Sequence, residues 1–509
     1  MEITYNGRKG LNLTDGDLIY KWVVDFARDK NWNILLSRDE IAKMEKSRNV
    51  VEKSCKNKKP IYGINTGVGA FANKIVSKND LAKLQYNIIK SHAVAVGDPL
   101  PKDISKAVLF LLINSLSKGF SGVRPELVNF LVNLFNKDII PVISSQGSLG
   151  ASGDLAQLAH LALVVIGEGQ VWRDGKICDT EIVFEEEKIK PFILQAKEGL
   201  SLINGTYVMA AIACFNLDYA ETLVNSADII GAISLEAYKG SVKPFSEIIS
   251  RMKNHEGQKE TSAIISKLIS GSKIIKSHKN CDKVQDPYSL RCIPQVHGDC
   301  RNIFNHTVEV VNIEINAITD NPIVYLKMIV SGGNFHGQRL SSVMRYLAGA
   351  LINLSAISER RINNLLDGSR EHLPKFLVKN SGINSGLMML QYTAASLVAD
   401  SKTRCPAIYS ENIPVSANQE DFVSMGMSAC QRVAEICQNT LNILAIELIC
   451  AAQAIEFIKE KPANKTFEIL SLIRNYVSFV LDDSAMNMHK DISKIAEIIN
   501  NGELLNVIK

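Results

Sequence analysis

The chain has 509 residues, of which 46% are hydrophobic, 6% aromatic and 22% charged, and its formal net charge is +4. This length holds about two to four average domains or one large helical assembly. The small net charge argues against nucleic acid or an anionic membrane as the partner.

Apolar residues recur at helical spacing along most of the chain, so the sequence predicts a mainly α-helical fold. Pro125 stands where a first-turn proline is tolerated, and Asp154 is a good N-cap for the apolar run that follows it. A short hairpin with an Asp-Gly turn is expected at 169–176, and strand content is otherwise minor. The predicted helices span residues 107–116, 125–136, 155–167, 204–233, 304–319, 340–367 and 425–459.

The last two predicted helices are longer than typical globular helices, and their apolar positions exceed the narrow stripe of a coiled coil, which favours a central bundle. Polar residues interrupt the apolar run at 441–457, so it suits a buried bundle helix better than a membrane span. We expect a mixed, mostly helical N-terminal domain with a little β structure over 1–198, and a central and C-terminal helical bundle over 199–509. The polar, Lys-rich segment 252–283 is predicted to form a solvated helical arm or loop.

The first residues show no basic segment followed by an apolar run, so we expect no secretion signal and a cytoplasmic location. The 10 cysteines include no CxxC pair, which indicates reduced thiols. The histidines show no HExxH or HxxxH spacing, so no metal site is predicted.

The segment 144–156 contains three consecutive small residues, Ala151, Ser152 and Gly153. Because Gly153 has no Cβ, it can adopt the strained backbone in which its amide nitrogen reaches the carbonyl carbon of Ala151. Cyclisation with loss of two waters would turn Ser152 into a dehydroalanine inside a five-membered ring, an electrophile that no side chain supplies. The alternative is an ordinary Gly/Ser loop that leads into a helix.

This segment continues into Asp-Leu-Ala-Gln-Leu-Ala-His at 154–160 and resembles the prosthetic-group signature of the aromatic amino acid ammonia-lyases. The resemblance extends over nearly the whole chain. It implies a 4-methylidene-imidazol-5-one (MIO) group formed from Ala151-Ser152-Gly153, with no metal or external organic cofactor. It also implies a small amino acid substrate and a homotetramer whose active sites are each assembled from more than one subunit. The long apolar helices agree with such an assembly, because one copy alone would expose too much apolar surface.

Tyr62 opens the stretch Tyr-Gly-Ile-Asn-Thr-Gly at 62–67, whose glycines favour a mobile or tightly turned loop. A phenol is a usable base only where positive charge or helix dipoles lower its pKa. Alone, this residue is better explained as a core tyrosine beside a turn. The stretch resembles the family's lid motif, which implies that Tyr62 is the catalytic base or acid.

Arg291 follows the block Gln-Asp-Pro-Tyr-Ser-Leu, and a guanidinium is the natural bidentate partner of a substrate carboxylate. An isolated arginine is usually a surface residue. The block as a whole, which runs on to residue 298, resembles the family closely. The resemblance implies that Arg291 holds the carboxylate and that Gln285 and Tyr288 support the site and the prosthetic group.

Asn204 and Phe335 are two further candidates. Asn204 could donate a hydrogen bond to the carbonyl oxygen of the MIO group, as an oxyanion-hole donor does, or could cap the long helix that follows, and the two roles are compatible. Phe335 would pack on an aromatic ring of the substrate, although an ordinary core phenylalanine explains it nearly as well.

Two positions bear on which aromatic amino acid is the substrate. His92 follows Ser91, as in the histidine-specific branch of the family, and Glu420 lies in Gln-Glu-Asp. A carboxylate can bond an imidazole, whereas a benzene ring gives it no partner. The alternative for Glu420 is a charge at a helix start. The histidine-specific pattern usually has histidine where Phe422 stands, the stretch 404–411 also differs from it, and Val68 and Phe71 are atypical near the lid.

We therefore expect a carbon–nitrogen lyase that eliminates ammonia from L-histidine to give trans-urocanate, the first step of histidine degradation. Within the family, the alternatives are a phenylalanine or tyrosine ammonia-lyase, or an aminomutase with the same group. A fumarase-type lyase that uses a serine base, without backbone modification, is a further enzyme alternative. A non-catalytic relative that acts as a scaffold is the last.

Overall fold

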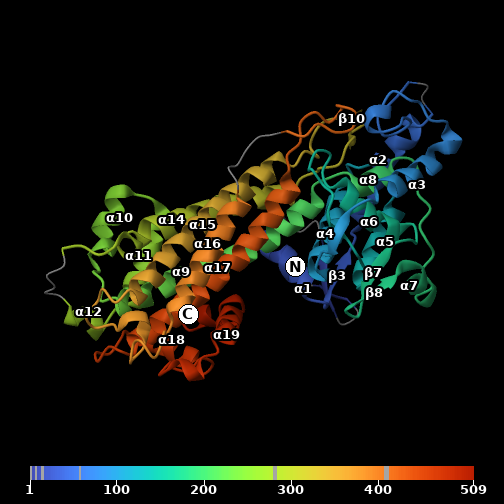
Figure 1. The fold of residues 1–509 in the computed structure, drawn as a ribbon. Helices are drawn as coiled ribbons and strands as arrows, with labels where there is room; N and C mark the ends of the chain where they lie inside the picture. Colours follow the sequence, from blue (N-terminus) through green and yellow to red (C-terminus); the bar gives the residue numbers. More distant parts are fainter. Residues whose placement is uncertain are drawn as a thin grey trace. The chain divides into compact units, whose positions relative to one another are not determined.

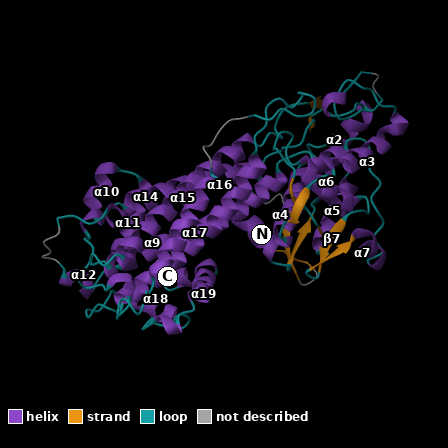
Figure 2. Ribbon diagram, viewed as in Figure 1, coloured by secondary structure: helices purple, strands orange, loops and turns teal. Residues whose placement is uncertain are grey.

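The structure is a computed structural model that describes residues 17–56, 59–278, 284–405 and 412–508, together with the backbone of 3–5 and 8–12. Helices dominate these residues and strands are short (Figure 2), so the prediction of a mainly α-helical fold is confirmed. The chain forms two compact units, each built from discontinuous segments. The predicted domain boundary between residues 198 and 199 stays a prediction. The first unit comprises Met1–Phe215, Val308–Met344 and Ser410–Gln431, and the second comprises Asn216–Thr307, Arg345–Tyr409 and Arg432–Lys509.

The centre of the first unit is α4 (Lys102–Ser117), whose residues from Ser105 onward are all buried. It packs against α1 (Tyr20–Arg28) and α5 (Pro125–Asn136). Pro125 occupies the first turn of α5, as predicted, because its missing N–H has no partner to lose there. The remaining helices of this unit are α2 (Arg38–Ser54) and α7 (Thr180–Glu186) and those that carry the candidate site, described below.

The strands of the first unit form small sheets at its edges. β4 (Val96–Pro99) pairs with β6 (Ser144–Gln146) and so anchors the segment that leads into the small-residue loop. The predicted hairpin is confirmed as β7 (Gln170–Arg173) and β8 (Lys176–Asp179), and Asp174 and Gly175 both have positive φ at its turn. The others are β1 (Ile3–Tyr5), β2 (Arg8–Asn12), β3 (Trp32–Leu35), β5 (Ile140–Pro141), β9 (Ile323–Tyr325) and β10 (Met328–Val330).

Three mutually packed helices of the first unit position most of the predicted site residues. They are α3 (Leu81–His92), α6 (Leu155–Val165) and the fully buried α8 (Glu198–Ile203). His92 is the last residue of α3, the small-residue loop leads directly into α6, and Asn204 is the C-cap of α8. Their packing therefore brings together residues that are far apart in the sequence.

The second unit is a bundle of long helices (Figure 1). Buried hydrogen bonds join the helices, as between Ser234 and Glu447 at 2.6 Å, and between Ser355 and Thr440 at 2.8 Å. The prediction of a central bundle is confirmed. The long helices are α9 (Tyr207–Ala237), α14 (Ile293–Glu314), α15 (Gln338–Leu366), α16 (Met388–Arg404) and α17 (Gly426–Ile455). All of α16 lies in the second unit, whereas one end of each of the others belongs to the first unit. Shorter ones are α10 (Glu247–Lys253), α11 (Glu256–Leu268), α12 (Lys273–Ser277), α13 (Tyr288–Arg291), α18 (Asn464–Arg474), α19 (Met488–Asn500) and α20 (Glu503–Asn506).

Some predicted helix limits are wrong for identifiable reasons. α14 begins at Ile293 rather than 304, because its first turns carry polar residues that are buried in pairs, such as Arg301 with Asp228 at 2.7 Å. The segment 252–283 is helical in its described part, but Gln258 and Thr261 are buried, so it is not a fully solvated arm. Residues 279–283 lie outside the described residues.

Two helices, α15 and α17, are long and apolar enough to cross a membrane by length and composition alone. Within their most apolar windows, 61% and 72% of the residues are buried inside the protein. This burial agrees with the prediction of bundle helices over membrane spans, because core helices of large domains are apolar all round.

Candidate active site

The small-residue loop closes against the backbone of Gly205. Gly153 forms a β-bridge with Gly205, and the following amide of Asp154 donates to the Gly205 carbonyl oxygen at 2.9 Å. A Cβ on Gly153 would lie 2.0 Å from that oxygen, and φ at Gly153 is +71°. Only glycine fits at this position, as cyclisation through its nitrogen also requires.

The loop is also held at its centre. The carbonyl oxygen of Gly150 accepts from Gly337 N at 3.0 Å and from Ser424 Oγ at 2.9 Å. Ser148 Oγ accepts from Gly150 N at 3.0 Å and donates toward Gly153 O at 3.2 Å. These bonds fix the loop on both sides of Ala151-Ser152-Gly153.

Asp154 occupies the N-cap position of α6, as predicted, but its side chain caps a different helix. Oδ2 accepts from the backbone amides of Val208 and Met209 at 3.0 and 2.9 Å, in the first turn of α9. Burial raises the pKa of Asp154 to about 7, against the lowering effect of these bonds. The residue therefore ties the end of the loop to the helix that follows Gly205.

One cavity of about 540 Å³ collects most of the predicted site residues of the first unit. A smaller adjoining hollow of about 360 Å³ shares several of them and adds Ala151 and Phe422. Apolar side chains such as Phe71, Leu84 and Leu155 complete the larger cavity. The predicted residues on its wall are Tyr62, His92, Ser152, Asn204, Phe335 and Glu420.

Tyr62 lies on the loop that was predicted to be a lid. Its hydroxyl oxygen accepts from Gly69 N at 3.4 Å. Burial raises the pKa of Tyr62, and the charge of Glu420 raises it further, whereas the Gly69 bond lowers it. The lowering that would make the phenol a ready base is therefore absent among the residues that the structure describes, and the phenol is protonated at neutral pH.

His92 and Glu420 both border the larger cavity. His92 Nδ1 lies 2.8 Å from the carbonyl oxygen of Ile88. Because a carbonyl only accepts, Nδ1 carries the hydrogen, and neutral His92 keeps a lone pair on Nε2. Glu420 pairs through its backbone with Val415, at 3.0 and 3.3 Å, and α17 begins only at Gly426. The alternative of a helix-start charge for Glu420 is therefore wrong.

Asn204 is held by a neighbour that the sequence did not single out. Its Nδ2 donates to the carbonyl oxygen of Asn321 at 3.1 Å, and α9 begins only at Tyr207. Asn204 is thus the C-cap of α8, and the predicted N-cap role is wrong. Asn321 borders both hollows, and the sequence shows it only as part of a helix-ending Asp-Asn-Pro.

Phe422 and His336 form a stacked pair at the rim of the smaller hollow. Their ring centroids are 6.0 Å apart, with planes 18° from parallel, and His336 Nε2 lies 3.2 Å from the Phe422 carbonyl oxygen. Phe422 replaces the expected histidine with an apolar ring that is 62% exposed. Of the atypical stretch 404–411, residues 406–411 lie outside the described residues.

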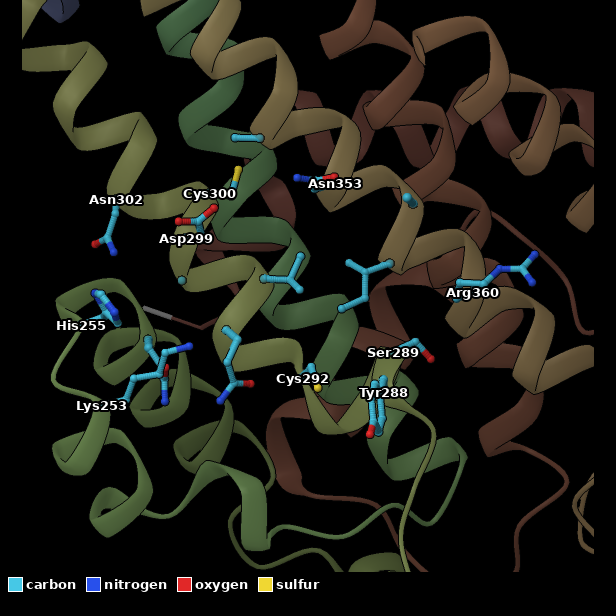
Figure 3. Close-up of a pocket in the computed structure, with 17 residues that line it drawn as sticks. Lys253, His255, Tyr288, Ser289, Cys292, Asp299, Cys300, Asn302, Asn353 and Arg360 are labelled. Carbon is cyan, nitrogen blue, oxygen red and sulfur yellow. The ribbon is translucent and has the colours of Figure 1, made fainter.

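Gln285, Tyr288 and Arg291 belong to the second unit. Tyr288 is 69% exposed and borders a separate cavity of about 600 Å³, together with Lys253, His255 and Arg360 (Figure 3). Arg291 ends the single turn of α13. Among the described residues that line the cavity around Ser152, these predicted residues do not occur. The predicted site residues therefore fall into two groups, one in each compact unit.

The protein is thus mainly helical, and its candidate site is a cavity beside a small-residue loop that hydrogen bonds hold in place. The family described as aromatic amino acid lyase matches residues 18–475. The chain belongs to this family, and the resemblance predicted from the loop is confirmed.

Relatives cover the chain almost completely. Histidine ammonia-lyase of Myxococcus xanthus (strain DK1622) is 42% identical over 98% of both chains, and that of Stigmatella aurantiaca is 43% identical over 99% of this chain and 98% of its own. Among solved structures, histidine ammonia-lyase from Trypanosoma cruzi has a TM-score of 0.89 at 33% identity and covers 98% of this chain and 95% of that one. Tyrosine aminomutase from Streptomyces globisporus has a TM-score of 0.91 at 33% identity, over 98% of both chains.

Proposed function

We propose that this protein is a histidine ammonia-lyase, which eliminates ammonia from L-histidine to give trans-urocanate. The observation that carries the proposal is one cavity in which Ser152 of the clamped Ala-Ser-Gly loop meets Tyr62, His92 and Glu420. Relatives named histidine ammonia-lyase match nearly the full chain at 42% and 43% identity. The site contains its own electrophile precursor, a candidate base and polar partners for an imidazole.

The loop fits an MIO group formed from Ala151, Ser152 and Gly153. Gly153 and Gly205 leave no room for a Cβ, and the bonds to Gly150 hold the loop directly before the tripeptide. When formed, this group supplies an electrophilic methylidene carbon that turns the substrate amine into a good leaving group. Asn204, whose amide hydrogens make it a donor, would hold its carbonyl oxygen.

Tyr62 would take the β-proton of the substrate through its phenol oxygen. Since burial raises the pKa of Tyr62, only a small fraction is phenolate near neutral pH, so this step is favoured by alkaline conditions. The elimination needs the proton removed beside the ring, and Tyr62 shares the cavity wall with the proposed ring-binding residues.

His92 and Glu420 would hold the imidazole ring. The Nε2 lone pair of His92 and the carboxylate of Glu420 are both acceptors, and one of them would take the single N–H of a neutral imidazole ring. A phenyl ring offers no N–H, and its binding would leave that acceptor without its partner, at a cost of about 1–3 kcal/mol. Phe335, on the same wall, would pack against the ring.

Arg291 would hold the substrate carboxylate, with Gln285 and Tyr288 beside it, and these residues would come from another copy of the chain. Tyr288 is exposed, as a residue offered to a partner must be. We therefore propose a homotetramer with shared active sites, located in the cytoplasm. Exposed apolar residues on the bundle, such as Tyr346, Met389 and Tyr392, support such an assembly because isolated copies would leave them in water.

A tyrosine or phenylalanine lyase, or an aminomutase, is the second candidate. The observation that favours it is Phe422, which places an aromatic ring where the histidine-specific pattern has a histidine. The structural likeness to a tyrosine aminomutase is as high as that to a histidine ammonia-lyase.

One experiment separates these candidates. Purified protein is weighed intact to establish whether two waters have been lost, and is then given L-histidine, L-tyrosine or L-phenylalanine. Urocanate absorbance with histidine alone supports the proposal. Cinnamate, coumarate or a β-amino acid in its place would overturn the choice of substrate, and an unchanged mass would overturn the prosthetic group.

A further inference from the structure

The ion pair between Lys197 and Asp320 is fully buried in the first unit. Lys197 Nζ donates to Asp320 Oδ2 at 2.7 Å and to Ser201 Oγ at 2.7 Å, and both charged side chains are 0% exposed. Apolar residues of similar volume often replace a buried ion pair without loss of stability. We therefore look for a role of this pair in orienting neighbouring groups rather than in stabilising the fold.

Hydrogen bonds connect this pair to the wall of the site. Asp320 Oδ1 accepts from Asn321 N at 2.6 Å, and Asn321 Oδ1 accepts from Gly332 N at 2.7 Å. The carbonyl oxygen of Asn321 then accepts from Asn204 Nδ2 at 3.1 Å. Asn321 is thus held through its amide and its side chain, which fixes the direction of its carbonyl.

We propose that Lys197 and Asp320 are positioning residues that set the amide orientation of Asn204. A carbonyl oxygen only accepts, so a fixed Asn321 carbonyl selects the orientation in which Asn204 turns its NH2 group toward it. The same nitrogen keeps a second hydrogen for an acceptor in the cavity that Asn204 borders. This inference rests on the proposed role of Asn204 as a donor to the prosthetic group.

The backbone connects the orientation of Asn204 to the position of this ion pair. Lys197 and Asn204 flank the single buried helix α8, as its N-cap and C-cap. The next residue, Gly205, is bridged to Gly153 of the loop. A displaced Lys197 or Asp320 would therefore change the aim of Asn204 while the loop itself keeps its other bonds.

The test is a double-mutant cycle with the full-length protein. Lys197→Met, Asp320→Asn and the combination of both are each made with Asn204 intact and with Asn204→Ala. We expect kcat for L-histidine to fall about tenfold to a hundredfold with Asn204 intact, and KM to change little, as when a residue that orients a catalytic group is lost. With Asn204→Ala, the same changes should lower kcat no further.

A second ion pair on the same helix provides the matched control. Arg124 and Glu198 pair at 2.7 Å, and Glu198 is buried directly beside Lys197. Glu198→Gln should lower the melting temperature as the Lys197 and Asp320 variants do, but should leave kcat unchanged. An equal loss of kcat in this control would overturn the positioning role, since any buried pair would then suffice.

A readout other than activity is the ultraviolet absorption of the mature protein, with intact mass as the check that cyclisation took place. Loss of a donor to a conjugated carbonyl shifts its band to shorter wavelength. We expect the same shift in Asn204→Ala, in Lys197→Met and in their combination. Shifts that add up, or equal losses of kcat with and without Asn204, would overturn the proposal.

The remaining outcomes are also decisive. If Asn204→Ala alone leaves kcat and absorption unchanged, then the proposed role of Asn204 fails, and with it this inference, while the lyase activity stands. If the charge variants do not fold, Ser201→Ala, which removes only one bond of Lys197, carries the same comparison with a smaller expected loss. No change of kcat in a folded Ser201→Ala variant would then count against the proposal.

Discussion

The cavity around Ser152 and the surface around Tyr288 differ in how completely one copy of the chain builds them. The loop beside the first is held by hydrogen bonds, and the predicted polar residues Tyr62, Asn204 and Glu420 on its wall are buried or half-buried. The second presents a mostly exposed tyrosine and an arginine at the end of a one-turn helix. This difference fits the proposed division of the site, in which the electrophile and the ring-binding residues come from one copy and the carboxylate-binding residues from another.

The largest loss of activity is expected from a substitution of Ser152, in the first of these two regions. Ser152→Ala cannot form a dehydroalanine, so turnover of L-histidine should fall by at least about a thousandfold, as when a main source of transition-state stabilisation is removed. Intact mass should then show no loss of water. Ser144→Ala, in β6 on the same segment, is the control and should keep both the mass change and the activity. Turnover unchanged in Ser152→Ala would revive the scaffold or serine-base alternatives.

The next effect tests whether the two groups of residues act in one site. Arg291→Met should raise KM for L-histidine about a hundredfold, because the carboxylate loses a charged, bidentate partner. Co-expression of Arg291→Met with Ser152→Ala should restore turnover at an L-histidine concentration too low for either variant alone, since mixed assemblies would contain sites with both residues intact. Absence of recovery in assemblies shown to be mixed would contradict sites shared between copies.

Features of the first unit with local sequence signals could be predicted from the sequence. Pro125 marks a helix start, Asp174-Gly175 marks a hairpin turn, and Ala151-Ser152-Gly153 is recognisable in its own context. Contacts between residues that are far apart in the sequence could not be predicted in this way. Nothing next to Asp154 indicates that it caps α9, and nothing next to Lys197 indicates that it pairs with Asp320.

The same limit applies at two site residues. The sequence gives a lowered pKa only as the condition under which Tyr62 is a usable base, and its pKa depends on burial and on Glu420, which lies far along the chain. The alternative in which Asn204 caps the helix after it is wrong, because the carbonyl of Asn321 takes its side chain instead. The sequence indicated which residues are candidates for the site, whereas the charges and hydrogen-bond partners around each of them became visible only in the fold.

Glu420 offers a test of specificity within the closed cavity. Glu420→Gln should lower kcat/KM for L-histidine about tenfold to a hundredfold, because a charge-assisted bond to the ring N–H becomes a neutral one. Activity toward L-phenylalanine, if measurable, should not fall, since a phenyl ring makes no such bond. The ratio of the two kcat/KM values is the measurement. Equal losses for both substrates would show that Glu420 acts on the reaction rather than on the ring.

A smaller and graded effect is expected from pH. Because the pKa of Tyr62 is raised, the fraction of phenolate increases with pH, so kcat should rise up to about tenfold per unit from about pH 7 to about pH 9. The pH profile of kcat is the appropriate measurement, since it reports groups of the bound complex and not the amine of free substrate. A flat profile over this range would contradict Tyr62 as a base whose pKa is raised.

The smallest effect is expected at the position that departs most visibly from the histidine-specific pattern. In Phe422→His, the bond from His336 to the backbone carbonyl of residue 422 can persist, and a ring of similar shape can keep the stack. Stacked rings contribute about 0.5–1.5 kcal/mol beyond the area that they bury, so kcat/KM for L-histidine should change by no more than about tenfold. A much larger gain for L-histidine, with a loss for L-tyrosine, would mean that Phe422 sets the substrate. The cavity around Ser152 would then favour a phenol or phenyl ring over an imidazole, and the second candidate function would replace the first.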